Sequence, residues 1–386
     1  MTSDFIKMIS DWRDIRYSRV MQNLSAQKVP CGMFLAPQAP ENTQGLRDFF
    51  KGKKLNLTCV CTMNEADKAR WQAAEGETVV SLEEFPALKN KPKYMFLMNG
   101  FFPMMFMDYF NKFGTKMFGF NGRSNAEDRY EFYMKRLPEL YAVHELFADE
   151  ESKKVFRAYM TAGVTNLIPD YRFAPEPQYF LEGFLPAKGD IAIDGGAFDG
   201  ATALDFAKQG ATVYAFEMNE NNYKNCAARI DTSGGGDIVL ENLGLSNQES
   251  EEKYRPGAAG SRKDPNGTLV AKFTDLDTYA LKNRLPRVDY IKLDIEGAEL
   301  DMLRGAAKTI TRYKPKMAIS AYHRREDLWT LANYVKSLRS DYEFKFRHYR
   351  IDCTDYLFND KQRAIFREYG LSYFCPSACE AVLYCR

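Results

Sequence analysis

The feature that most constrains this chain is a glycine-rich turn that directly follows a short apolar segment. Residues 191–194 have the pattern of a buried strand, and Gly195, Gly196 and Gly200 follow it before a helical segment that begins near Ala201. Glycines let the backbone come close to a ligand, and the first turn of a helix offers N–H groups to an anion. The pattern predicts a strand–turn–helix that binds a nucleoside cofactor. The alternative is an ordinary turn with a tight glycine packing contact.

An acidic residue at the end of the next predicted strand supports a cofactor site. Glu217 follows the apolar residues of 212–216, and an acid at this position accepts hydrogen bonds from ribose hydroxyls. Asp194 suits the cationic amino group of S-adenosylmethionine, and Ala197 stands where a dinucleotide fingerprint expects glycine. We therefore expect S-adenosylmethionine rather than NAD. The predicted cofactor-binding residues are Asp194, Gly195, Gly196, Ala197, Gly200, Glu217 and, near the adenine, Asn242.

Three carboxylates lie at the end of a second predicted strand, 288–294, or directly after it. Asp294 ends this strand, at the sheet edge where ligands usually bind, and Glu296 and Glu299 come directly after it. We expect Glu296 and Glu299 to contact the substrate. Favourable charge in the first turn of a helix is the alternative for Glu299. We expect no bound metal, with a divalent ion on the three carboxylates as the alternative.

A third predicted strand, 317–322, delivers a histidine to the same edge. Transfer of a methyl group to an alcohol requires the hydroxyl proton to leave, and a histidine near its ordinary pKa accepts protons at neutral pH. We expect His323 to be this catalytic base, with Asp294 as its competitor. A structural or substrate-contacting role is the alternative for His323. We expect His144 to be structural and His348 to lie on the surface at a strand end.

Alternating strand and helix patterns predict an α/β protein with two domains. We expect an N-terminal helix in 1–29, with Phe5, Met8, Ile9, Trp12 and Ile15 on its apolar face, and a small α/β domain in 30–125. A helical connector over 126–186 and a doubly wound, mostly parallel seven-stranded sheet over 187–386 follow. The glycine- and proline-rich segment 255–267 is expected to be a mobile loop that closes over the site. The seven expected strands are 191–194, 212–217, 238–242, 288–294, 317–322, 344–348 and 381–385.

Composition narrows the partners and the compartment. The 53 Lys and Arg residues balance 52 Asp and Glu residues, which argues against a nucleic-acid partner. No apolar stretch reaches the ~18 residues of a membrane span. The eight cysteines occur without an export signal, which predicts free thiols and a cytoplasmic location. We expect a small-molecule or glycan substrate and leave open a homo-oligomer.

Three blocks together resemble the FkbM family of methyltransferases. They are 194–200, 291–299 and 321–329, and Tyr179-Phe180 and 380–384 are also similar to that family. The resemblance covers about residues 150–386. It implies a Rossmann-like methyltransferase fold and O-methylation, commonly of sugars or polyketide hydroxyls.

The first domain resembles the degenerate Rossmann-like modules that precede some of these catalytic domains. In place of a glycine-rich turn it has Ala36-Pro37-Gln38-Ala39-Pro40-Glu41-Asn42, which disfavours dinucleotide binding. We expect a role in substrate recruitment or dimer formation. For the whole chain we expect an O-methyltransferase that acts on a sugar, a glycan or a related natural product. The alternatives are an NAD-type oxidoreductase and a non-catalytic cofactor-binding scaffold in glycan assembly.

Overall fold

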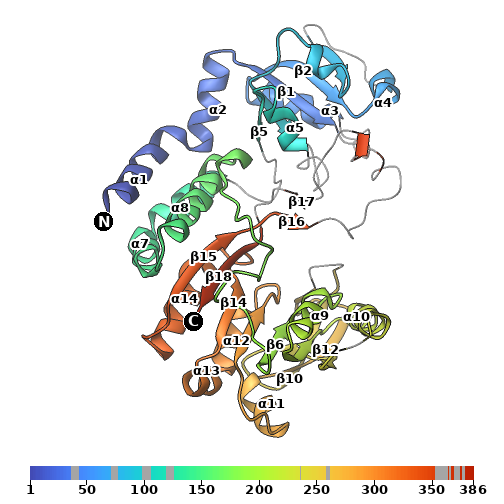
Figure 1. Ribbon diagram of the computed structural model, residues 1–386. Helices are drawn as coiled ribbons and strands as arrows, with labels where there is room; N and C mark the ends of the chain where they lie inside the picture. Colours follow the sequence, from blue (N-terminus) through green and yellow to red (C-terminus); the bar gives the residue numbers. More distant parts are fainter. Residues whose placement is uncertain are drawn as a thin grey trace. The chain divides into compact units, whose positions relative to one another are not determined.

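The computed structural model divides into two compact units, each assembled from several segments of the chain (Figure 1). Unit 1 comprises 1–141, 154–173 and 348–378, and unit 2 comprises 142–153, 174–347 and 379–386. The expected C-terminal domain, 187–386, is therefore divided between them, because 348–378 groups with unit 1. The structure describes residues 1–35, 43–70, 77–97, 106–118, 126–234, 236–257, 261–352, 364, 367–368, 374–375 and 379–386.

Unit 1 is built on a parallel five-stranded sheet with the strand order β3-β2-β1-β4-β5. Its strands are β1 Pro30–Leu35, β2 Asn56–Thr62, β3 Thr78–Ser81, β4 Tyr94–Leu97 and β5 Lys116–Phe118. Successive side chains of β1 point to opposite faces, so Met33 and Phe34 belong to two different apolar clusters. Both faces are therefore buried, as the apolar strands require. The segment 36–42, where a glycine-rich turn would stand, lies outside the described residues.

The helices of unit 1 and of the expected connector are short. They are α1 Ser3–Ile15, α2 Tyr17–Ala26, α3 Thr43–Gly52, α4 Glu65–Arg70, α5 Met107–Asn111, α6 Ala126–Met134, α7 Leu137–Leu146 and α8 Glu150–Thr165, with 3-10 turns at Phe85–Ala87 and Ile168–Asp170. A two-stranded sheet of β16 Ile351–Asp352 and β17 Phe374–Cys375 completes the unit. Among the described residues, no helix combines the length and apolarity that crossing a membrane requires.

The N-terminal segment differs from the single helix that was expected. It forms two helices because the backbone of Arg16 is extended, with φ −59° and ψ 151°. Phe5, Met8 and Trp12 are buried as the apolar face predicts, but Ile15 is 37% exposed because it lies next to this break. The indole N–H of Trp12 donates to the hydroxyl of Thr161 at 3.0 Å, which ties α1 to α8 within unit 1.

Unit 2 is built on a seven-stranded sheet with the order β15-β18-β14-β13-β6-β7-β8. β18 runs antiparallel to β14, whereas the pairs from β14 to β8 are parallel. The mixed α/β class with a parallel sheet is thus confirmed. The strands are β6 Ile191–Gly195, β7 Thr212–Phe216, β8 Ile238–Glu241, β13 Tyr290–Leu293, β14 Lys316–Ser320, β15 Phe344–His348 and β18 Ala381–Cys385.

The strand order reverses between β6 and β13, in the middle of the sheet. From β6 the chain progresses outward to β8, and from β13 it progresses the other way. Because parallel crossovers are right-handed, the helices of the two halves cover opposite faces. Ligands bind at such a switch point, outside the carboxyl ends of the strands. The helices are α9 Ala201–Lys208 and α10 Glu220–Thr232 in one half, and α11 Leu276–Lys282, α12 Glu299–Gly305, α13 Ala307–Tyr313 and α14 Asp327–Leu338 between β8 and β15.

Three residues of the segment expected as a mobile loop, 255–267, pair in a small second sheet: Arg255, Arg262 and Lys263. Arg255 pairs with Arg262 across an antiparallel hairpin, and Gly267 packs so tightly that a Cβ there would lie 2.2 Å from the carbonyl oxygen of Tyr254. This glycine therefore serves a close backbone contact; 258–260 lie outside the described residues. The strands are β9 Gly244–Leu245, β10 Ser250–Arg255, β11 Arg262–Lys263 and β12 Leu269–Thr274.

Candidate active site

The glycine-rich turn after β6 is held against the end of β13. Gly196 has φ +78°, and a Cβ there would lie 1.9 Å from the carbonyl oxygen of Asp294. The N–H groups of Gly196 and Ala197 both donate to the carbonyl of Phe216 at 3.0 Å. These two N–H groups therefore bind the end of β7, and the N–H groups predicted to face a ligand are those of the first turn of α9. Glycine is required at 196 because two strand ends meet there.

The glycines on either side of Gly196 are equally constrained. A Cβ on Gly195 would lie 3.0 Å from a methyl carbon of Leu293, and a Cβ on Gly200 would lie 2.8 Å from the sulfur of Cys226. Gly200 also has φ +82° and caps α9. The turn therefore has one fixed shape, set by its packing against the rest of the sheet.

A buried ion pair lies beneath this turn. Asp194 is fully buried, and its Oδ1 lies 3.0 Å from Nζ of Lys292. Nζ also donates to the carbonyl of Gly196 at 2.8 Å. Burial lowers the pKa of Lys292, but the charges of Asp194 and Asp294 outweigh it and raise that pKa overall. Asp194 is therefore paired within the protein, and its contact with the cofactor's amino group, directly or through water, stays a prediction.

Lys292 is a functional residue that the sequence reasoning missed. It lies in β13, where all four residues are buried. A lysine in a central parallel strand must find a partner inside the sheet, because both faces are covered. That signal was present in the sequence, since Lys292 interrupts an otherwise apolar run.

Glu217 lies directly after β7 and is braced by backbone groups. Its Oε2 accepts from the N–H of Phe198 at 3.0 Å, and its Oε1 accepts from the N–H of Asn219 at 2.8 Å. Burial raises its pKa, and these hydrogen bonds only partly offset the rise. A carboxylate has about four acceptor positions, so two are left for hydroxyl donors. The side chain of Asn242 donates to the carbonyl of Glu217 at 2.8 Å and so braces the same strand end.

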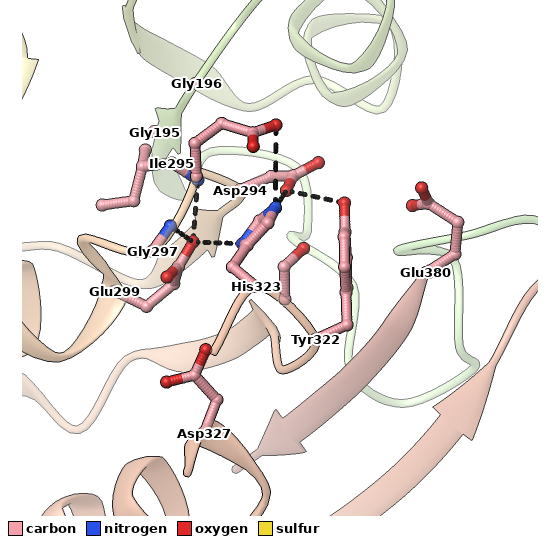
Figure 2. Close-up of polar contacts among 12 residues, drawn as sticks. Gly195, Gly196, Asp294, Ile295, Gly297, Glu299, Tyr322, His323, Asp327 and Glu380 are labelled. Atoms are coloured by element: carbon pink, nitrogen blue, oxygen red, sulfur yellow. Dashed lines mark hydrogen bonds and ion pairs between the residues drawn. The ribbon is translucent and has the colours of Figure 1, made fainter. Parts of the chain in front are cut away.

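Four side chains gather at the ends of β13 and β14, and we call them the Asp294 cluster: Asp294, Glu296, Glu299 and His323. Figure 2 labels Asp294, Glu299 and His323 of this cluster. Nδ1 of His323 lies 2.9 Å from Oε1 of Glu299. Its Nε2 lies 3.4 Å from Oδ1 of Asp294 and 3.7 Å from Oε1 of Glu296. The side chains of Asp294 and Glu296 are 26% and 30% exposed, so the cluster opens to solvent on their side.

Glu299 occupies the closed side of the cluster. Its side chain is fully buried, and Oε1 also accepts from the N–H groups of Ile295 at 3.0 Å and Gly297 at 3.4 Å. Glu299 therefore holds the ring of His323 from the buried side of the cluster. Its burial favours a positioning role over the predicted substrate contact, whereas Glu296 lies on the open side.

Two tyrosines that the sequence reasoning left without a role orient Asp294. The hydroxyl of Tyr179 donates to Oδ2 at 2.8 Å, and the hydroxyl of Tyr322 donates to Oδ1 at 3.2 Å. Burial raises the pKa of Asp294, but His323, Lys292 and the hydroxyl donors lower it further than burial raises it. Asp294 is therefore a fixed, ionised carboxylate at neutral pH. Both tyrosines belong to segments that resemble the FkbM family, which was the available signal.

The surroundings of His323 differ from those of a histidine with its ordinary pKa. Burial lowers the pKa of the imidazole, but the contacts with Glu296 and Glu299 and the negative charge of Asp294 raise it well above its ordinary value. Three neighbouring carboxylates favour the protonated imidazole, which is a poor proton acceptor. Asp294 is the acceptor that this geometry favours.

The other two histidines are buried. His348 is fully buried, and its ring lies 4.8 Å from the ring centroids of Tyr171 and Phe173 and 5.0 Å from that of Tyr159. The expected surface position is wrong because these aromatic rings, from a distant part of the sequence, enclose it within unit 1. His144 is 1% exposed.

The chain resembles known proteins in a family model, in sequence and in fold. Residues 194–351 match the family model described as the methyltransferase FkbM domain. The hexuronic acid methyltransferase AglP of Haloferax volcanii is 27% identical over 125 residues, which are 31% of this chain and 52% of that protein. The chain thus spans about half the length of this curated relative. Its fold also resembles the crystal structure of methyltransferase FkbM from Methylobacillus flagellatus KT, with 18% identity, a TM-score of 0.63 and coverage of 99% and 98% of the two chains.

The family match begins at Asp194 and extends past the Asp294 cluster, so it includes the turn, Glu217 and the four cluster residues. The three sequence blocks that resemble the FkbM family fall inside it. Residues 194–351 are therefore similar to the methyltransferase FkbM domain.

Proposed function

We propose that this chain is an S-adenosylmethionine-dependent O-methyltransferase that acts on a hydroxyl of a sugar, a glycan or a related natural product. The observation that carries the proposal is the contact between the turn and the Asp294 cluster. The N–H of Asp294 donates to the carbonyl of Gly195 at 3.0 Å, at the point where the strand order reverses. A cofactor on the turn and an acceptor on the cluster would be neighbours there.

The residues around the turn fit an adenosyl group. Glu217 has two acceptor positions free of backbone partners, which suits the two hydroxyls of a ribose. The shape of the turn comes from Gly195, Gly196, Ala197 and Gly200. The buried ion pair of Lys292 and Asp194 supports the turn. When bound, S-adenosylmethionine supplies an electrophilic methyl group. Asn242 contributes by holding the strand end that carries Glu217.

The Asp294 cluster fits the handling of an acceptor hydroxyl. The hydroxyl must lose its proton as its oxygen forms the new bond to carbon, and the ionised, partly exposed carboxylate of Asp294 accepts it. Tyr179 and Tyr322 fix the direction of that carboxylate. Glu296, on the open side, orients the acceptor. Holding the acceptor in line with the methyl group contributes much of the rate.

The relative named for hexuronic acid suggests where to look for the acceptor. The full chain is incubated with radiolabelled S-adenosylmethionine and a panel of hexuronic acids, neutral sugars and hydroxylated natural products. We expect label in one acceptor class. Asp294→Asn should lower turnover about 10²–10⁴-fold, the usual contribution of a general base. Glu326→Gln, an exposed neighbour of the cluster, is the matched control. Unchanged turnover in Asp294→Asn would remove Asp294 from the mechanism.

A further inference from the structure

The hydrogen bonds of Glu299 decide which nitrogen of His323 faces the open side of the cluster. Oε1 of Glu299 accepts from two backbone N–H groups and from Nδ1 of His323. A carboxylate accepts only, so the ring proton of a neutral His323 is on Nδ1. Nε2 then presents a lone pair towards Asp294 and Glu296. Its side chain is 8% exposed, and Nε2 is a buried nitrogen without a hydrogen-bond partner.

The charge of the two carboxylates beside Nε2 is balanced either by a second proton on the ring or by a metal ion that Nε2 binds through its lone pair. The separations from Nε2, 3.4 Å to Asp294 and 3.7 Å to Glu296, are long for hydrogen bonds. They are close to the ~3.4 Å that separates two ligands of a tetrahedral ion with bonds of about 2.1 Å. Donor atoms of Asp294, Glu299 and His323 lie within 4.8 Å of one another, so the cluster brings together enough ligand atoms for a metal ion. Nε2 of His323 therefore lies at the distance of a fellow ligand from both exposed carboxylates.

We propose that a divalent transition-metal ion of the Mn²⁺ or Zn²⁺ type binds to Nε2 of His323, Oδ1 of Asp294 and Oε1 of Glu296. One imidazole with two carboxylates is a donor set that such ions accept. Glu299 is the outer partner that orients the imidazole from Nδ1, as carboxylates do behind metal-bound histidines. This proposal replaces the expectation of a site without metal.

The role of the ion rests on the proposed O-methylation. Asp294 and Glu296 are the exposed members of the cluster, so a further coordination position would face an incoming hydroxyl. A bound cation lowers the pKa of a coordinated hydroxyl, whose proton then passes to water. The acceptor oxygen forms its bond to the methyl carbon as the carbon–sulfur bond breaks and leaves a neutral thioether. Asp294 would then serve as a ligand instead of as the direct proton acceptor.

The site is tested by titrating Mn²⁺ into the metal-stripped full chain, without donor or acceptor, and measuring free Mn²⁺ by electron paramagnetic resonance. Mn²⁺ is chosen because soft thiolates favour other metals, so the buried cysteines compete little. We expect one ion per chain and at least tenfold weaker binding in Glu296→Gln. Glu326→Gln is the control and should bind like the wild type. Thermal melting verifies that each variant is folded.

Absence of bound Mn²⁺ at millimolar concentration, or equal binding by folded Glu296→Gln, would overturn the metal site. Zn²⁺ should displace the bound Mn²⁺, since both would use the same three side chains. Methyl transfer at the full rate by a metal-stripped chain in chelator would overturn the role of the ion and leave the O-methyltransferase intact. Mn²⁺ binding without methyl transfer to any acceptor would support the site and count against the proposed function.

Discussion

Lys292 and Asp194 are partners across two central strands, β13 and β6, and their charged atoms lie 3.0 Å apart inside the sheet. The same ammonium donates to the carbonyl of Gly196. One buried cation thus neutralises the acid at the end of β6 and fixes the turn that follows it. The glycine-rich turn after β6 and the end of β13, where the Asp294 cluster begins, are therefore both held by Lys292.

Removing this cation should be costly. Lys292→Met leaves the carboxylate of Asp194 buried without its partner, and breaking such a pair costs about 3–5 kcal/mol in the free energy of unfolding. Urea unfolding measures the loss. The double variant Lys292→Met/Asp194→Asn should recover part of it, because no net charge is then buried. Lys282→Met, which removes an exposed ion pair with Glu249, should have little effect. Equal stabilities of Lys292→Met and Lys282→Met would refute the support role.

A comparison of two glycines distinguishes the stability cost of backbone strain from that of close packing. Gly196 and Gly189 have similar φ values, +78° and +83°, but a Cβ would lie 1.9 Å from the carbonyl of Asp294 at 196 and has nothing within 4 Å at 189. Gly189→Ala should therefore lose about 1–2 kcal/mol from the left-handed backbone alone. Gly196→Ala should lose considerably more, because the turn must move away from β13. Thermal unfolding measures the stability of both variants, and similar losses of stability would contradict the close contact at Gly196.

Glu217 should contribute to binding of the adenosyl group. Glu217→Gln weakens charge-assisted hydrogen bonds worth about 1.5–3 kcal/mol, so affinity for S-adenosylhomocysteine should fall about 10–100-fold. Calorimetry on the full chain measures this affinity. Glu220→Gln is the matched control, because Glu220 is exposed and pairs with Lys224 on the surface of α10. An unchanged affinity in Glu217→Gln would remove Glu217 from the cofactor site.

Acid should weaken one structural ion pair of unit 2. Burial raises the pKa of Asp149, but hydrogen bonds from the guanidinium of Arg347 and the backbone N–H of Ser152 outweigh it and lower the pKa to about 2. A carboxyl whose pKa is depressed on folding stabilises the fold above its unfolded pKa of about 3.9, and loses this contribution as pH falls through the folded pKa. The stability difference between wild type and Asp149→Asn should therefore be constant above pH ~5 and shrink towards pH ~2. Urea unfolding across this range measures it, and a constant difference would contradict the pairing.

The strand ends of the site could be predicted because each follows from local pattern. The apolar runs before Asp194, Glu217 and Asp294 are short, and each ends in an acid. Parallel strands bring such ends to one edge, so their common location follows from fold class alone. The small sheet at β9–β12 was not predicted, because its strands are short and β10 is mostly charged, which hides the alternation.

Contacts over long sequence separations could not be predicted. The hydrogen bond between Tyr179 and Asp294 joins residues that are 115 positions apart in the sequence, and no local pattern indicates it. The burial of His348 likewise depends on aromatic rings from a segment more than 170 residues earlier. The raised pKa of His323 was not predicted for the same reason, because it depends on three carboxylates that the fold brings around the ring.

The central claim is that the chain moves a methyl group onto an acceptor oxygen at the Asp294 cluster. The most direct measurement uses S-adenosylmethionine with a ¹³C-labelled methyl group, the full chain and glycans that contain hexuronic acid, with NMR of the product. We predict a labelled carbon bonded to oxygen on a sugar, and its loss in an Asp294→Asn variant that still binds S-adenosylhomocysteine. Label bonded to nitrogen or carbon, or the same O-methyl product from that variant, would contradict the account.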